Sequence, residues 1–219
     1  MTTHSPAITA PFWRSRRAAA IAGIVFAVLL LAAMTIWGIA ISDHSMESLK
    51  SDASRRGLIR LSQNLVPFAG IAFLWFIGVV RENLGDVEDR LFSTVFLGSG
   101  LLLLALLFVG AANSASLLEM LDGSSVDADV YTYGRDSAQT LLSVYGMRMA
   151  AVFTLSVSTV GLRTGAIPRW VSYVGYTTSL VLLLGAGEHR WTQLVFPSWV
   201  LLVSLMILLR RQSKWADPR

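Results

Sequence analysis

The chain has 219 residues, of which 54% are hydrophobic and only 15% are charged, and its net charge is +4. A soluble domain carries about 25% charged residues, so this composition, with a mean hydropathy of +0.58, argues against a soluble protein and indicates an integral membrane protein. The absence of Cys excludes disulfides, thiolate metal sites and iron–sulfur clusters. The basic residues flank apolar runs, which is typical of membrane topology signals and not of nucleic-acid binding.

Six apolar segments follow one another, each near the ~20 residues that a transmembrane helix needs. The predicted spans are 18–41, 61–80, 91–112, 139–161, 170–187 and 191–209. We therefore predict an all-α, polytopic membrane helical bundle that forms one domain over residues 1–219. The first span follows three arginines, as a signal peptide would, but its 24 uncharged residues exceed the roughly 7–15 of a signal-peptide core. It is expected to be a retained helix.

The distribution of Lys and Arg predicts that both termini are cytoplasmic. With this orientation, eleven basic residues lie on the inner side: Arg14, Arg16, Arg17, Arg81, Arg90, Arg163, Arg169, Arg210, Arg211, Lys214 and Arg219. Six lie on the outer side: Lys50, Arg55, Arg56, Arg60, Arg135 and Arg190. Four of those six belong to one mixed-charge segment, 42–60, which is the weakest point of the topology and a candidate interfacial helix.

A second outer segment, 117–137, is acidic. It contains Glu119, Asp122, Asp127, Asp129 and Asp136 against the single cation Arg135. Asp127 and Asp129 have the spacing that opens a calcium loop, but the glycine at the sixth position and the glutamate at the twelfth are missing. We expect a solvated acidic loop and no metal site.

The segment from Arg163 to Trp170 predicts a tight reversal at the cytoplasmic face. Gly165 and Pro168 punctuate it, and Pro suits the first turn of a helix, so Pro168 is expected to start the fifth span. Arg163, Arg169 and the belt residue Trp170 are expected to anchor this turn at the membrane surface. An anionic-lipid head-group site at the turn is the alternative interpretation.

Arg148 is the only charged residue within any predicted span. It lies about nine residues, or ~14 Å, inside span four, near the middle of a ~30 Å hydrocarbon core. Tyr145 shares its helix face, one turn towards the outside. The groups expected to meet it lie on the outer side; they include Gln63, Asn64, Asn113 and Glu119.

Three interpretations of Arg148 remain open. It locks the helices together through one carboxylate or a few carbonyls, it binds an anionic head group or small anion in an outward-facing polar notch, or it takes part in transport. Transporters usually carry more intramembrane ionisable groups or visibly broken helices.

Catalytic chemistry has little support in the sequence. The three histidines, His4, His44 and His189, all lie in the tail or outer loops, so an axial haem ligand within a span is missing. There is no H-E-x-x-H, no phosphate-binding loop and no Ser–His pair at membrane depth. No catalytic residue, metal or cofactor is predicted.

Three stretches carry a resemblance to a known group. The motifs "YGMRMAAVFTLSVSTVGLRTGAIPRW", "NLVPFAGIAFLWFIGVVRENLG" and "EDRLFSTVFLGSGLLLL" resemble multi-pass membrane proteins of high-GC Gram-positive (actinobacterial-type) bacteria. The resemblance covers spans two to five and implies a bacterial plasma-membrane location and a six-helix fold, without an activity. It implies that Arg148, Arg163, Pro168, Arg169 and Trp170 belong to the family pattern.

These observations together predict a non-enzymatic accessory or binding protein of the bacterial plasma membrane, with Arg148 at the base of an outward-facing polar site. Its expected partners are the lipid bilayer, an anionic lipid and another membrane protein. The alternatives are a small secondary transporter or channel, and a lipid-modifying enzyme in which His44 or His189 meets Glu119 or an aspartate in one pocket.

Overall fold

The computed structural model describes residues 12–41, 49, 51–84, 90–122, 127–165 and 167–209. About 95% of these residues are helical, and none of them is in a β-strand. The predicted all-α class is therefore confirmed. His44 and both chain ends lie outside the described residues.

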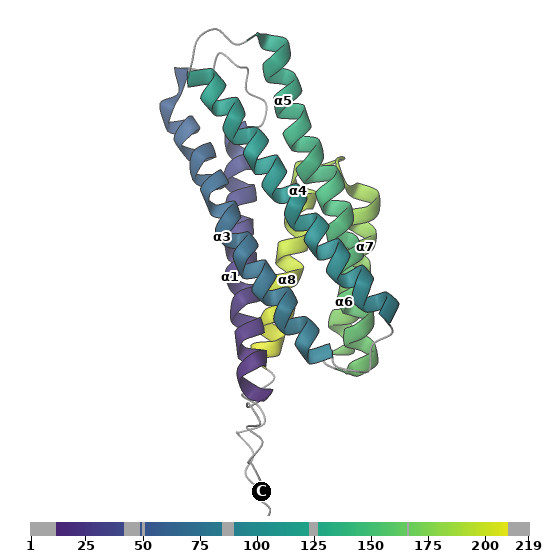
Figure 1. Cartoon of the computed structure of the whole chain (residues 1–219). Helices are drawn as coiled ribbons and strands as arrows, with labels where there is room; N and C mark the ends of the chain where they lie inside the picture. Colours follow the sequence, from purple (N-terminus) through teal and green to yellow (C-terminus); the bar gives the residue numbers. More distant parts are fainter. Residues whose placement is uncertain are drawn as a thin grey trace, which may run out of the picture.

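The helices run up and down along one bundle axis (Figure 1). In chain order they are α1 (Phe12–Ile41), α3 (Ala53–Leu84), α4 (Arg90–Asp122), α5 (Ala128–Thr140), α6 (Met147–Thr164), α7 (Arg169–Gly185) and α8 (Val195–Leu209). A π-helical turn, η2 (Leu141–Gly146), joins α5 to α6, and a 3-10 turn, η3 (Arg190–Leu194), precedes α8. The start of α1 and the end of α8 lie at the same end of the bundle (Figure 1).

Within the described residues, five helical segments are long and apolar enough to cross a membrane: Arg17–Ala40, Ala53–Arg81, Ser93–Asp122, Ala128–Thr164 and Trp191–Leu209. They match five of the six predicted spans. The remaining prediction, 170–187, corresponds to α7, which has 17 residues and stands at the short limit of about 17–25 residues for a spanning helix. The count of six spans stays a prediction.

The acidic segment 117–137 was expected to be a loop, but its described residues are helical apart from Asp127; most described residues of the candidate interfacial helix 42–60 are helical as well. Residues 53–60 form the first turns of α3, residues 117–122 the last turns of α4, and α5 covers 128–140. Asp127 caps α5 by accepting a hydrogen bond from the backbone N–H of Asp129 (3.2 Å). Polar composition misled the prediction here, because an aspartate before a helix supplies the acceptor that its first N–H groups need.

Six fully buried phenylalanines hold the centre of the bundle together: Phe26, Phe73, Phe76, Phe96, Phe153 and Phe196. Phe73 lies at their middle, with ring centroids 4.4 Å from Phe26 and 5.1 Å from Phe153. Five helices contribute these rings. Because lipid tails are as apolar as these side chains, it is close packing and not transfer from water that favours helix association here.

Small residues allow α6, α7 and α8 to approach closely. A Cβ atom added at Gly175 of α7 would lie 1.9 Å from Ser158 Oγ of α6 and 2.9 Å from Trp199 Nε1 of α8. Such small-residue contacts are typical of membrane helix interfaces.

The predicted reversal between α6 and α7 is confirmed. Gly165 ends α6 with a left-handed φ of 65°, a conformation that glycine adopts without steric cost. Pro168 is the residue before α7, and its carbonyl accepts hydrogen bonds from the N–H groups of Val171 (3.0 Å) and Ser172 (3.3 Å).

Candidate functional site

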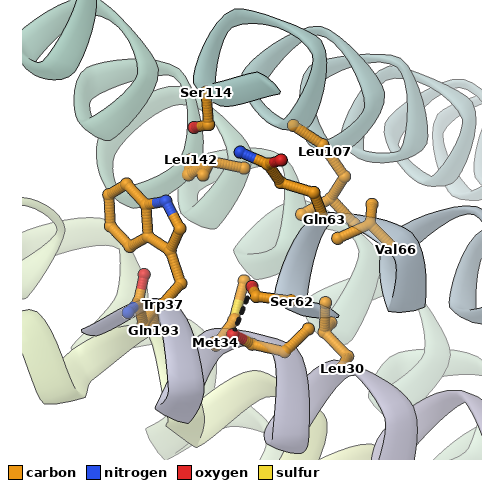
Figure 2. A pocket seen from close by; sticks show the side chains of 12 residues that line it. Leu30, Met34, Trp37, Ser62, Gln63, Val66, Leu107, Ser114, Leu142 and Gln193 are labelled. Atoms are coloured by element: carbon orange, nitrogen blue, oxygen red, sulfur yellow. Dashed lines mark hydrogen bonds between the residues drawn. The ribbon is translucent and has the colours of Figure 1, made fainter. Parts of the chain in front are cut away.

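A cavity of about 30 Å³ lies between α1, α3, α4, η2 and η3. It belongs to the half of the bundle away from the start of α1, since Trp37 is near the end of α1 and Ser62 near the start of α3. Its lining is apolar apart from a few neutral polar side chains (Figure 2). The lining residues are Leu30, Ala33, Met34, Trp37, Ser62, Gln63, Val66, Leu107, Ala111, Ser114, Leu142 and Gln193.

Two N–H donors at this cavity have no hydrogen-bond partner among the residues that the structure describes. They are the indole Nε1 of Trp37 and the amide Nε2 of Gln63, which come from α1 and α3. In Figure 2 both nitrogens face the space between these helices and α4. A buried donor without an acceptor costs about 1–3 kcal/mol, so the cavity is the natural place for a missing acceptor.

The other polar side chains at the cavity are already engaged. The hydroxyl of Ser62 donates to the carbonyl of Ala33 (2.8 Å), and the hydroxyl of Ser114 donates to the carbonyl of Gly110 (3.0 Å). The hydroxyl of Ser143, in η2, donates to Oε1 of Gln193 (3.4 Å). The free lone pairs of the Ser62 and Ser114 oxygens remain available to an occupant.

The backbone is irregular on two sides of the cavity. Pro67 lies inside α3 and has no N–H, so the carbonyl of Gln63 lacks the donor that residue 67 would normally supply. On another wall, the six-residue π-helical turn Leu141–Gly146 interrupts the α-helix. Turns of this kind are rare and occur frequently at functional sites.

Arg148 does not line this cavity. It lies on the exposed surface of α6, next to the half-exposed ring of Tyr145 (54%). It forms no hydrogen bond or ion pair with any residue that the structure describes. The cation that the sequence places at membrane depth therefore faces outwards from the bundle.

The remaining predicted site residues are dispersed. Gln63 is the only predicted member that lines the cavity, whereas Asn64 is exposed, Asn113 is half-buried beside the lining residue Ser114, and Glu119 is exposed near the end of α4. At the opposite end of the bundle, the proposed anchors Arg163, Arg169 and Trp170 are all exposed. The described contacts thus give no single notch that joins Gln63, Arg148 and Glu119.

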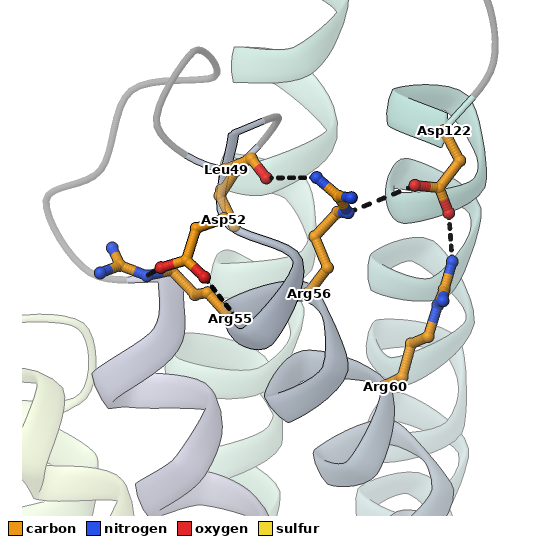
Figure 3. Close-up of polar contacts among 6 residues, drawn as sticks. All are labelled: Leu49, Asp52, Arg55, Arg56, Arg60 and Asp122. Atoms are coloured by element: carbon orange, nitrogen blue, oxygen red, sulfur yellow. Dashed lines mark hydrogen bonds and ion pairs between the residues drawn. The ribbon is translucent and has the colours of Figure 1, made fainter.

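Four of the six basic residues that opposed the topology prediction form ion pairs with described residues: Arg55, Arg56, Arg60 and Arg135. Asp122, in the last turn of α4, contacts the guanidinium groups of both Arg56 and Arg60 of α3, with 3.3 Å between Arg56 Nε and Asp122 Oδ1. Arg56 also donates to the carbonyl of Leu49 (2.9 Å). Figure 3 shows this cluster, which joins the two charged outer segments.

Sequence reasoning missed most of the cavity. Trp37, Ser62, Ser114 and Gln193 are neutral, belong to four different segments, and form no motif. The interruption of the α-helix at Leu141–Gly146 also has no sequence signature.

Comparison of the chain with protein-family models, with curated proteins and with solved structures gives no match.

Proposed function

We propose that this chain is a non-enzymatic binding protein of a bacterial plasma membrane, with six spans and both termini in the cytoplasm, and that Arg148 binds the head group of an anionic lipid. The observation that carries the proposal is the exposure of Arg148 on α6 without an anionic partner among the described residues. It departs from the pin interpretation, which requires one carboxylate or a few carbonyls of the bundle on the guanidinium.

The depth of Arg148 makes an anionic occupant favourable. Along the continuous helix Ala128–Thr164, Arg148 lies 12 residues, or about 18 Å, from Asp136 and 15 residues, or about 22 Å, from Arg163. An arginine near the centre of a spanning helix costs roughly 2.5–3.5 kcal/mol. A phosphate that meets the guanidinium offsets part of this cost.

The geometry of the side chain suits a lipid phosphate. Side chains on a helix lean towards its N-terminus, so Arg148 leans towards Tyr145 and towards the outer head groups. The planar guanidinium binds phosphate oxygens through two parallel hydrogen bonds. The exposed Tyr145 hydroxyl, one turn away, is placed to add a third contact.

The test compares lipid binding by the purified wild-type protein with lipid binding by variants at Arg148. Wild-type protein is expected to melt at a higher temperature with phosphatidylglycerol than with phosphatidylcholine, and to retain phosphatidylglycerol in native mass spectrometry. Arg148→Met should abolish both differences, and Arg148→Lys should retain part of them. Leu155→Met, on the same exposed face, is the matched control and should behave as wild type. A full phosphatidylglycerol effect in Arg148→Met would refute the proposal.

The orientation has its own test, helped by the absence of natural Cys. A membrane-impermeant maleimide should label Thr132→Cys in intact cells. Ser213→Cys, near the C-terminus, should react only after the membrane is permeabilised. The reverse pattern would place the Arg148 side chain nearer the inner leaflet and overturn the proposed topology.

Neither alternative function gains a supporting observation. The enzyme hypothesis needs a histidine beside an outer acid, and among the described residues His189 and Glu119 are both exposed and form no ion pair with each other. The cavity at Trp37 and Gln63 lies in one half of the bundle, and transport would need access from both ends.

A further inference from the structure

The cavity at Trp37 and Gln63 has the chemistry of a neutral binding site. Trp37 is only 7% exposed, yet its indole N–H, which can only donate, has no acceptor in the described part of the chain. The amide nitrogen of Gln63 likewise has no acceptor among the described residues. Two unpaired donors at one cavity define what the occupant must supply, namely an oxygen that accepts hydrogen bonds.

The lining also excludes charge from the occupant. None of its twelve residues is ionisable, so an anion would lack a countercharge and a cation would lack carboxylates in a low-dielectric interior. The occupant that fits this uncharged lining is neutral.

The volume limits the occupant to a small group. A water molecule needs at least about 10–15 Å³ of such space, so 30 Å³ accommodates two waters or a single carbonyl group. Placed at this cavity, either one supplies the acceptor for Trp37 Nε1 and Gln63 Nε2.

We propose that this cavity is a binding site for a neutral oxygen acceptor, held by the N–H groups of Trp37 and Gln63. The oxygen comes either from ordered water or from the ester carbonyl of a lipid. The site is independent of the Arg148 proposal, because Arg148 is not among the lining residues.

A second group of unpaired polar atoms provides an internal comparison. Ser158 Oγ and Trp199 Nε1 also lack partners among the described residues, but they lie against Gly175, where an added Cβ would approach them to 1.9 and 2.9 Å. This interface has no room for an occupant. Trp199 is therefore the matched control, a buried indole in a dry environment.

The experiment observes the indole N–H signals of the protein labelled with ¹⁵N-tryptophan. The seven tryptophans are assigned by Trp→Phe variants; if Trp37→Phe does not fold, the six others assign Trp37 by elimination. Spectra are recorded in dodecyl maltoside, which contains no carbonyl group, and in nanodiscs of ester phospholipid. The Trp37 signal is expected downfield of the Trp199 signal, as for a hydrogen-bonded N–H.

The two sources of the oxygen give different results. A downfield Trp37 signal in both media, with a cross-peak to water, identifies ordered water. A downfield signal only in the ester phospholipid, without that cross-peak, identifies a lipid carbonyl. A Trp37 signal at the position of Trp199 in both media overturns the proposal.

Changes at Gln63 test whether the two donors share one occupant. Gln63→Met keeps the side-chain length without the amide, and it is expected to shift the Trp37 signal. Asn64→Met removes the neighbouring, exposed amide and should leave that signal unchanged. An unchanged Trp37 signal in Gln63→Met would show that Gln63 does not hold the occupant.

Discussion

The guanidinium of Arg56 lies 3.3 Å from a carboxylate oxygen of Asp122, which also contacts Arg60. One carboxylate thus joins the first turns of α3 to the last turn of α4. Exposed ion pairs each contribute about 0.2–1 kcal/mol and weaken with salt. We expect Asp122→Asn to lower the free energy of unfolding by about 1 kcal/mol at low salt and by less at high salt, measured by thermal melting. Glu119→Gln, one turn away and without a described partner, should change little in either condition.

Asp52 caps α3 and gives a pH-dependent prediction. The backbone N–H of Arg55 donates to its carboxylate (3.0 Å), which lowers the pKa of Asp52 below its ordinary value, and the ion pair with the Arg55 side chain acts in the same direction. Because the unfolded chain holds this proton more tightly, the stabilisation is present at neutral pH and is lost as the pH falls through the folded pKa.

The measurement for Asp52 compares melting temperatures of wild type and Asp52→Asn from about pH 6 to pH 3. Asparagine keeps an acceptor for the N–H of Arg55 but does not titrate. The advantage of wild type should therefore shrink as the pH falls. A difference between the two proteins that stays constant over this range would contradict the prediction.

Because of the close contact at Gly175, adding a single methyl group there is expected to lower the stability of the protein. Gly175→Ala would bring Cβ to 1.9 Å from Ser158 Oγ, and overpacking of this kind costs about 1–3 kcal/mol. Gly78→Ala is the control, because an added Cβ there meets nothing within 4 Å and alanine favours the helix by about 0.5–1 kcal/mol. The double variant Gly175→Ala, Ser158→Ala should recover part of the loss in a chemical-denaturation series.

The contribution of the phenylalanine cluster to stability can be tested at Phe73. Its ring is fully buried between the rings of Phe26 and Phe153, whereas Phe68 on the same helix is 63% exposed. Removing a buried phenylalanine costs about 3–5 kcal/mol, so Phe73→Ala should strongly destabilise the protein. Phe68→Ala should have a much smaller effect, and equal losses in the two variants would show that the cluster does not form as described.

Arg148→Leu separates a lipid-facing arginine from one that locks helices together. Because no described carboxylate loses its partner, the variant should melt no lower than wild type in neutral detergent. Insertion of span four by itself should become more favourable by roughly 2.5–3.5 kcal/mol, measured in a translocon insertion assay. A marked loss of melting temperature would instead support a structural pin.

The candidate site shows where sequence reasoning stops. Charge and depth single out Arg148, but the direction in which it faces depends on which side of α6 contacts α4 and α7. Gln63 was predicted as a site residue because it is an amide near the end of a span. Its partner Trp37 was not, because a tryptophan near a span end is equally typical of the interfacial belt.

The helical class, the positions of five apolar helices and the turn at Gly165 and Pro168 follow from local sequence patterns. These features are local, because in lipid each segment must satisfy its own backbone hydrogen bonds. Only the tertiary structure decided that Trp37, Gln63 and Gln193 meet at one cavity while Arg148 faces outwards. Since lipid and the bundle interior are equally apolar, hydrophobic periodicity carries little information about which helix faces meet, and packing alone assigns them.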